Sequence, residues 1–188
     1  MTATVDPTIT FTIDNTGVST GSTACGNTAF GSNAANTTAT QVAFGSLTLG
    51  ASNNLAQRLT CTTNATGGYV VTVYETATMK NINTGTTLVD TTCNSACTTS
   101  TAGAWTSTTN SGWGYTIQGL AGIGSTAFTF PNYKPFGVGY ANTQTIFSNT
   151  SKPTANEQAY VCYRLVASTT QEAGNYETQI TYTATATF

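Results

Sequence analysis

Apolar and polar residues alternate at both ends of the chain. From Val5 to Ile13 every second residue is apolar, and the last thirteen residues, 176–188, show the same pattern with threonines between the apolar positions. Side chains of a β-strand point to opposite faces with a period of two, so each end is predicted to be one long strand with an apolar and a hydroxylated face. The C-terminal segment is predicted to be a central strand that buries Ile180, Tyr182 and Phe188.

Other apolar runs, bounded by turn residues, predict further short strands. They are Val42–Leu49, Leu55–Thr62, Gly68–Thr76, Trp113–Gln118, Ala127–Phe130, Phe136–Tyr140 and Gln158–Ala167. Since no window shows a 3.6-residue period over three turns, we expect no helix longer than about two turns. Such a series predicts an all-β, antiparallel β-sandwich of jelly-roll or immunoglobulin-like type. Residues 16–41 and 77–112, rich in Thr, Ser, Asn and Gly, are predicted to be long surface loops.

The N-terminal strand is the candidate assembly element. We expect residues 15–188 to form a single β-sandwich domain and residues 1–14 to be a donor strand, because terminal strands are the elements that one subunit can lend to another. Pro7 has no amide hydrogen, which suits a strand with one free side. A strand that folds back into its own domain would show the same pattern, so the sequence leaves both arrangements open. The side chains predicted to enter a neighbour are Val5, Pro7, Ile9, Phe11 and Ile13.

Composition points to an extracellular protein. Threonine accounts for 45 of the 188 residues, only 6% of residues are charged, the net charge is −2 and histidine is absent. Threonine favours strands and solvates a surface without charge, and low charge favours self-association. Five scattered lysines and arginines cannot form a phosphate-binding stripe, so no nucleic-acid partner is expected. No apolar stretch is long enough for a membrane span, and without a signal peptide we expect the mature form of a secreted or cell-surface protein.

Five cysteines accompany this composition. Without histidine or a CxxC pair a zinc site is not expected, and disulfides place the chain outside the cytosol. Cys93 and Cys97 are predicted to close a small loop, and Cys61 is predicted to bridge to Cys162. Cys25 is then the odd one, which is free, pairs with a neighbouring subunit, or replaces a partner in one of these bridges.

Residues for catalysis or cofactor binding are sparse. Without histidine a serine or threonine nucleophile lacks its ordinary base, and the seven acids form neither a motif nor a calcium-binding cluster, so we expect no enzyme activity, cofactor or metal. The aromatic residues downstream of position 112 are predicted to fill the core rather than to form a sugar-stacking platform. Trp105, in a polar loop, is the better candidate for an exposed glycan contact.

Three segments resemble Thr-rich surface domains of secreted bacterial proteins. They are TATVDPTITFTID at residues 2–14, TTNATGGYVVTV at 62–73 and AGNYETQITYTATATF at 173–188, roughly a third of the chain. The layout is similar to that of the WxL domains and of the TasA and camelysin fibre proteins. Neither tryptophan is followed by the x-Leu of a WxL motif, so peptidoglycan binding is not implied. The resemblance to TasA-type and pilus subunits implies a jelly roll whose N-terminal strand completes the next subunit.

These observations predict a structural subunit of an extracellular, pilus-like filament, a homopolymer built by donor-strand complementation. The alternative is a non-polymeric surface adhesin or carbohydrate-binding domain with the same fold. A secreted hydrolase is a third and weaker alternative, because it has no recognisable catalytic residues.

Overall fold

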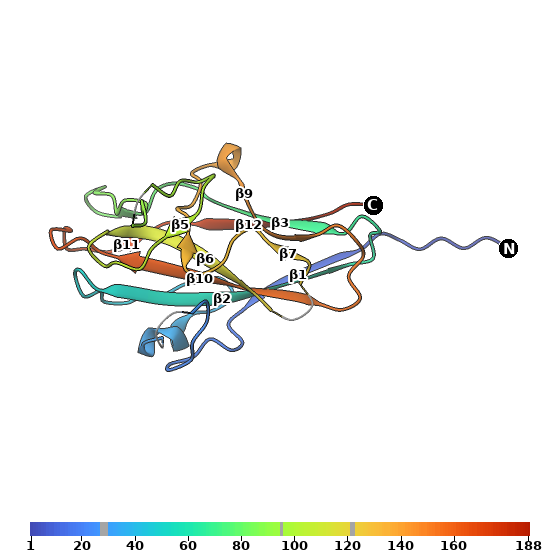
Figure 1. Ribbon diagram of the computed structural model, residues 1–188, viewed down its shortest axis with the longest axis horizontal. Helices are drawn as coiled ribbons and strands as arrows, with labels where there is room; N and C mark the ends of the chain where they lie inside the picture. The colour runs from blue at the N-terminus through green and yellow to red at the C-terminus, as the bar shows by residue number, and fades with distance from the viewer. Residues whose placement is uncertain (27–29, 95, 121–122) are drawn as a thin grey trace.

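The computed structural model describes residues 1–26, 30–94, 96–120 and 123–188. Its long strands form two four-stranded antiparallel sheets that pack face to face, so the predicted all-β sandwich is confirmed (Figure 1). Sheet A has the order β1 (Ile9–Asp14), β2 (Ser52–Thr63), β10 (Glu157–Val166) and β6 (Gly112–Gly119). Sheet B has the order β12 (Ile180–Ala186), β3 (Tyr69–Glu75), β9 (Gln144–Asn149) and β7 (Ser125–Thr126).

The remaining elements are short. Two small ladders pair β4 (Lys80–Asn81) with β11 (Tyr176–Glu177) and β5 (Gly103–Ala104) with β8 (Asn132–Tyr133). The helical elements of the described residues are two 3-10 turns, η1 (Ser32–Asn36) and η2 (Tyr140–Asn142), as the lack of helical periodicity predicted. Within those residues no helix has the length and apolar character needed to cross a membrane.

The core lies between the two sheets. Inward side chains such as Leu59, Val71 and Val161 are fully buried. Trp113 stacks on Tyr163 and Phe136, with ring centroids 5.7 and 5.2 Å apart. The alternation read from the sequence therefore places the apolar face of each long strand correctly.

The two sheets differ in what covers their outer faces. A segment of about 35 residues between β1 and β2 packs against sheet A, on the side away from sheet B (Figure 1, blue segment). Phe30 and Ala34 of this segment are buried in one cluster with Ala56 of β2 and Cys162 of β10. This second apolar layer explains why β10 is buried on both faces, with a sequence in which apolar residues run almost continuously.

The strand predictions were wrong at several positions. The C-terminal segment is broken at residues 178–179, and β12 is an edge strand of sheet B, not a central one. Ile180 and Tyr182 are only half-buried and Phe188 is 67% exposed. Alternation shows that one face of a strand is buried, but it carries no information on how many neighbours the strand has.

Three predicted strands are loops, and one of the longer strands was missed. Val42–Leu49 packs Val42, Phe44 and Leu47 against the core without joining a sheet. Phe136–Tyr140 supplies the buried Phe136 and then turns into η2, and Ala127–Phe130 follows β7 as an irregular segment. The missed strand is β9, whose apolar run was too short to recognise.

Candidate assembly site

The predicted donor strand is divided by the structure into two parts. Residues 9–14 form β1, which pairs antiparallel with β2 of the same chain, from Ile9 opposite Thr63 to Asp14 opposite Arg58. Asp14 and Arg58 also form a two-pronged ion pair, with N···O distances of 3.0 and 2.8 Å. Phe11 and Ile13 pack against the core of their own domain, so residues 9–14 belong to that domain, which corrects the expected boundary after residue 14.

The first eight residues belong to no strand. They leave the end of the sandwich as an extended, exposed arm that runs along the long axis of the molecule (Figure 1). Val5 is 83% exposed and Pro7 is also exposed. The base of this arm is held by Asn64, which accepts a hydrogen bond from the Thr8 amide and donates one to the Asp6 carbonyl, both at 2.8 Å. We call residues 1–8 the N-terminal arm.

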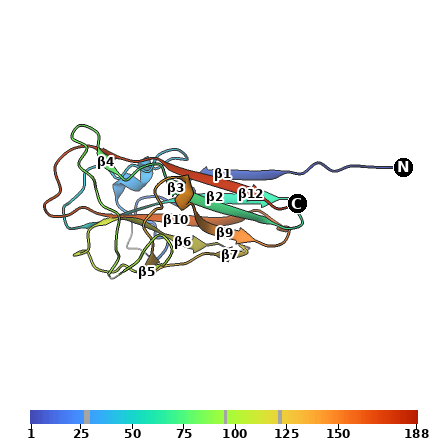
Figure 2. The ribbon, with the colours of Figure 1, turned by 90° about the horizontal axis from the view of Figure 1, so that it is seen from above.

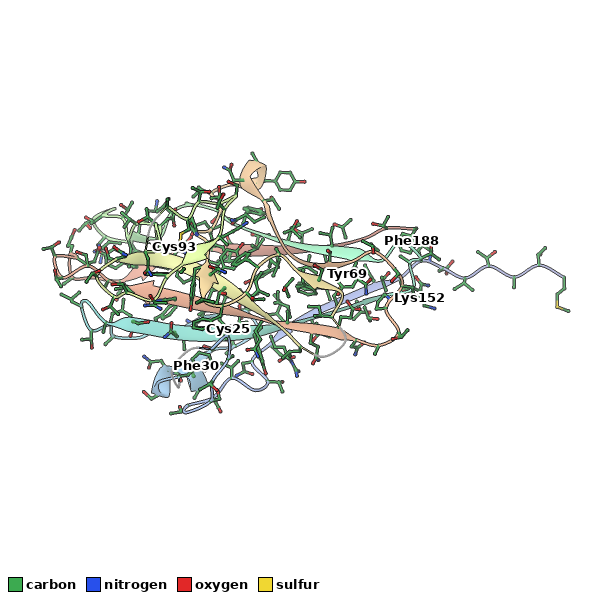
Figure 3. The ribbon with its side chains drawn as sticks, in the orientation of Figure 1. Cys25, Phe30, Tyr69, Cys93, Lys152 and Phe188 are labelled. Atoms are coloured by element: carbon green, nitrogen blue, oxygen red, sulfur yellow. A yellow bond between two sulfur atoms is a disulfide. The ribbon has the colours of Figure 1, made fainter. Side chains whose placement is uncertain are left out.

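A polar cleft of about 350 Å³ lies beside the base of the N-terminal arm. Thr8, Thr10, Asn64 and Lys152 are among the residues that line it. Lys152 is exposed at the same end of the molecule as Phe188 and the start of the arm (Figure 3). The surroundings of the arm are therefore hydroxylated, with one positive charge.

One side of the sandwich is an open seam. β1 is the edge of sheet A, β12 is the edge of sheet B, and the two edges lie next to each other (Figure 2). Apolar side chains along this side stay partly accessible, including Ile9, which is 38% exposed, and Tyr182 and Ala184, which are half-buried. We call this side the β1–β12 seam; both of its edge strands have a sheet neighbour on one side only.

Cys61 lies on β2, beside β1 in the same sheet. It is opposite Phe11 in the ladder, is fully buried and forms no disulfide. Burial, together with the nearby Glu157 carboxylate, raises the pKa of this thiol to about 11. A thiol with so high a pKa is unreactive near neutral pH while it is covered, so its reactivity reports whether β1 is in place.

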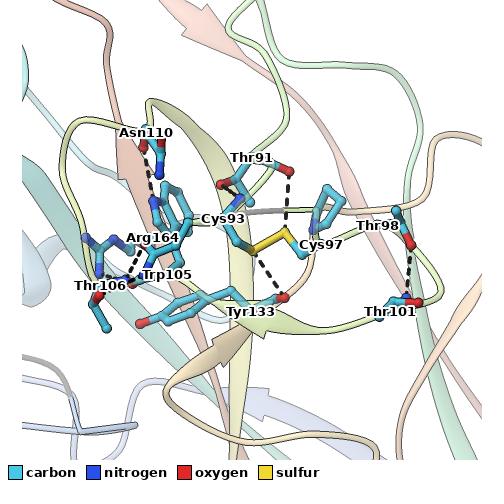
Figure 4. Close-up of a disulfide and its surroundings, with 12 residues drawn as sticks. Thr91, Cys93, Cys97, Thr98, Thr101, Trp105, Thr106, Asn110, Tyr133 and Arg164 are labelled. Atoms are coloured by element: carbon cyan, nitrogen blue, oxygen red, sulfur yellow. Dashed lines mark hydrogen bonds between the residues drawn. A yellow bond between two sulfur atoms is a disulfide. The ribbon is translucent and has the colours of Figure 1, made fainter.

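The disulfides confirm one of the two predicted bridges and correct the other, and Cys25 takes the third of the alternatives left open for it, replacing Cys61 as the partner of Cys162. Cys25 is bonded to Cys162, and Cys93 to Cys97 as predicted (Figures 3 and 4). The bridge predicted between Cys61 and Cys162 is geometrically excluded, because Cys162 is opposite Ala56 in the ladder and points to the outer face of sheet A, whereas Cys61 points to the core. Cys25 is thus the residue that fastens the segment between β1 and β2 to β10.

Trp105 is not an exposed contact. It is fully buried, packs edge-on against Tyr133 with ring centroids 5.5 Å apart, and donates from Nε1 to the Asn110 carbonyl (Figure 4). The Arg164 guanidinium lies 4.8 Å from the Trp105 ring centroid and donates to the Trp105 carbonyl. The loop that looked polar in sequence is folded around an arginine from sheet A, which no local pattern could show.

Most of the other aromatic residues fill the core, as predicted. Trp113, Tyr115, Tyr133 and Phe136 are all at most 2% exposed. Phe130, at 38% exposed, and Tyr140, at 77% exposed, are exceptions, although the sequence placed both with the core group.

A fully buried and a half-buried carboxyl group, fifteen residues apart in sequence, come together in the structure. Glu75, at the end of β3, is fully buried; Asp90 is its hydrogen-bonding neighbour, and Trp113 donates to Glu75 from Nε1 at 3.2 Å. One oxygen of each carboxyl group, Oε1 of Glu75 and Oδ1 of Asp90, has no donor among the described residues. Among the described residues, no lysine or arginine forms an ion pair with Glu75 or Asp90.

This arrangement requires a proton between the two acids. Burial, and secondarily Asp90, raises the pKa of Glu75 to about 8, and burial raises the pKa of Asp90 to about 6. Glu75 is therefore protonated at neutral pH and donates to the Asp90 carboxylate. Neither acid is among the residues that line the two clefts described for this structure.

The carboxyl pair predicts a pH dependence of stability. Between pH 4.5 and 8 the folded state keeps a proton on Glu75 that the unfolded chain releases, so the free energy of unfolding falls as the pH rises, by at most about 1.4 kcal/mol per pH unit. Replacing Glu75 by Gln removes this titration and should flatten the curve across that window. Urea unfolding at half-unit pH steps measures it, with Glu172→Gln as a control at an exposed acid; equal slopes for wild type and Glu75→Gln would contradict the shared proton.

No metal centre was found among the described residues, where no three His, Cys, Asp or Glu side chains gather. Comparison with known proteins gives no significant match to a family model, a curated protein or a solved structure. The resemblance to fibre proteins read from the sequence therefore stays a prediction.

Proposed function

We propose that this protein is a structural subunit of an extracellular filament, and that the N-terminal arm of one subunit adds a strand to the next. The observation that carries this proposal is the arm itself. Its residues are extended and exposed, and they continue the alternation of β1, yet they have no sheet partner among the described residues of the chain. A regular apolar alternation without a partner is unfavourable in water unless another molecule covers it.

The β1–β12 seam is the acceptor that fits the arm best. Strand addition needs an edge with free N–H and C=O groups and pockets that take every second side chain. β12 offers an edge of seven residues, and the arm is eight residues long. Val5 and Pro7, the apolar positions of the N-terminal arm, would cover the partly exposed side chains of the seam. Pro7 would form a backbone hydrogen bond only through its carbonyl, because it has no amide hydrogen.

The geometry of the contact favours a chain of subunits. The arm starts at one end of an elongated molecule and points away from it (Figures 1 and 2). A contact between the arm of one copy and the seam of another uses two different surfaces, which leaves a free arm and a free seam after each addition. Such a heterologous contact propagates into a filament unless the rotation closes a ring.

An extracellular location agrees with two disulfides, one of which spans 137 positions in sequence. Bonds of this kind form and persist in oxidising compartments. Within this proposal no residue acts as a catalyst and no cofactor is required. The role is assembly, and any glycan contact would be an additional property of the assembled surface.

Deleting residues 1–8 is the direct test of the proposal. We expect the truncated protein to stay folded with only a small loss of stability, because the deleted residues are exposed and contribute only the hydrogen bonds at the base of the arm. We expect it to lose assembly, because the donated strand is gone. The measurement is sedimentation velocity and negative-stain microscopy of wild type and variant at matched concentration. Cys61 labelling should stay slow in both, which shows that β1 is still docked.

Single substitutions sharpen this comparison. Val5→Asp places a charge in the arm and should weaken assembly strongly, whereas Val89→Asp is a matched control at a 54% exposed valine of another loop. Fibres formed by the truncated protein, or absence of fibres from the wild type under all conditions, would overturn the proposal. Loss of assembly in both valine variants would mean that net charge, and not the arm, controls association.

A further inference from the structure

The outer face of sheet B is a neutral surface of hydroxyl groups. Its outward positions are mainly threonines, Thr72 on β3, Thr145 on β9 and Thr181, Thr183 and Thr185 on β12. Thr183, Thr72 and Thr145 are directly opposite one another across three strands. Strand geometry spaces such hydroxyls about 6.7 Å apart along a strand and about 4.8 Å between strands.

This face is left open, although the equivalent face of sheet A is not. The segment between β1 and β2 covers sheet A and is fastened there by the Cys25–Cys162 disulfide. On sheet B, Thr145, Thr183 and Thr185 stay exposed, and no outward position of β3, β9 or β12 carries a charge. β-Branched side chains have few rotamers, so these hydroxyls are already held in place for a ligand.

An exposed aromatic ring stands at one end of the face. Tyr140, 77% exposed, contacts Tyr74 of β3 edge-on, with centroids 6.0 Å apart, and Tyr74 is opposite Thr181. Tyr140 begins η2, the orange turn at the top of Figure 1. The exposed ring of Tyr140 therefore lies next to the threonine array.

The turn that carries Tyr140 is rigid. Glu75 and the segment 137–139 exchange two backbone hydrogen bonds, of 3.0 and 2.7 Å, and Asn142 donates from Nδ2 to the Val138 carbonyl at 2.7 Å. Gly137 is packed so closely on Asn142 that any side chain at position 137 would collide with the Asn142 carbonyl. A large exposed aromatic ring on a turn held this firmly costs little entropy to use in binding.

A cleft continues the surface beyond Tyr74. It has a volume of about 350 Å³ and is lined by Thr76, Thr178 and Gln179, with Lys80 and Glu177 supplying one charge of each sign. The polar side chains of the cleft can both donate and accept hydrogen bonds. The combined site is an aromatic platform between a hydroxyl array and a polar cleft.

We propose that the outer face of sheet B binds a neutral polysaccharide. The Tyr140 ring stacks on the C–H face of one sugar ring, and the threonines bond the hydroxyl groups of neighbouring sugars. A charged polymer has no counter-charge on the three strands, and a second copy of the chain would find few apolar side chains to bury. A repeating, uncharged, hydroxyl-rich ligand matches the periodic array, and this inference does not depend on filament formation.

The test is retention of the full chain on three insoluble neutral polysaccharides, microcrystalline cellulose, chitin and a β-1,3-glucan. We expect the wild type to bind at least one of them. Tyr140→Ala should weaken that binding at least tenfold, whereas Tyr140→Phe, which keeps the ring, should bind like the wild type. Thr183→Lys should weaken binding, and Thr12→Lys, the same change at an exposed threonine of sheet A, should leave it unchanged.

Three results would overturn the proposal. They are absence of retention on all three polysaccharides, retention that is insensitive to Tyr140→Ala and Thr183→Lys, and equal losses in Thr183→Lys and Thr12→Lys. If the Thr183→Lys variant instead sediments at a lower mass than the wild type, a second copy of the chain covers the face and the polysaccharide proposal is wrong. If the wild type changes the shape of growing ice crystals and binds none of the polysaccharides, the ligand of the threonine array is ordered water, and the polysaccharide proposal is wrong.

Discussion

Replacing Cys25 and Cys162 together by alanine is expected to lower the free energy of unfolding by about 5 kcal/mol, the largest effect predicted for this chain. The bridge spans 137 positions, so reducing it releases a very long loop in the unfolded state. It also fastens the covering segment to sheet A, where Phe30 and Ala34 are buried. Both cysteines are at most 2% exposed, so alanine is a suitable replacement because it adds no buried hydroxyl.

The matched control is the double replacement of Cys93 and Cys97 by alanine. That bridge spans only four positions, and the same loop-entropy relation gives a loss of about 2 kcal/mol. Urea unfolding followed by tryptophan fluorescence measures both variants, since Trp105 and Trp113 are buried in the native state. Equal losses in the two variants, or a larger loss in the short-loop variant, would show that loop length does not set the contribution of these bridges.

Replacing Arg164 by alanine is expected to cost about 3 kcal/mol of stability. Its side chain is 6% exposed and has no acidic partner among the described residues. The guanidinium donates to the carbonyls of Trp105 and Ser107 and lies against the Trp105 ring (Figure 4). Removing it leaves two carbonyl oxygens in the loop without these donors, and the cavity exposes the loop to water. The buried cluster of Trp105 and Tyr133 should loosen as a result.

Arg58→Ala is the control for this change. Arg58 is also an arginine of sheet A, but its ion pair with Asp14 is partly exposed, so its loss should cost at most about 1 kcal/mol. Denaturant unfolding gives the two free energies, and near-ultraviolet circular dichroism reports the packing of Trp105. A cost for Arg164→Ala no greater than that for Arg58→Ala would mean that the loop holds its shape without the guanidinium.

The sequence was sufficient to predict the class of fold and the faces of the long strands. Alternation at β1, β3 and β12 identified which side chains point inward, because the period of a strand is a local property of the backbone. The Cys93–Cys97 bridge was predictable for a related reason, since the two residues are only four positions apart in sequence. The prediction that most aromatic residues lie in the core was also correct, because large apolar side chains are needed to fill the space between the two sheets.

Contacts between distant segments were decided only by the tertiary structure. The pairing of β1 with β2, the edge position of β12 and the bridge from Cys25 to Cys162 depend on which strands become neighbours, and alternation is the same for every neighbour. The shared proton of Glu75 and Asp90 and the burial of Trp105 around Arg164 likewise arise where separate loops meet. Local pattern determined the direction of each side chain in the long strands, and the packing of the two sheets determined what it touches.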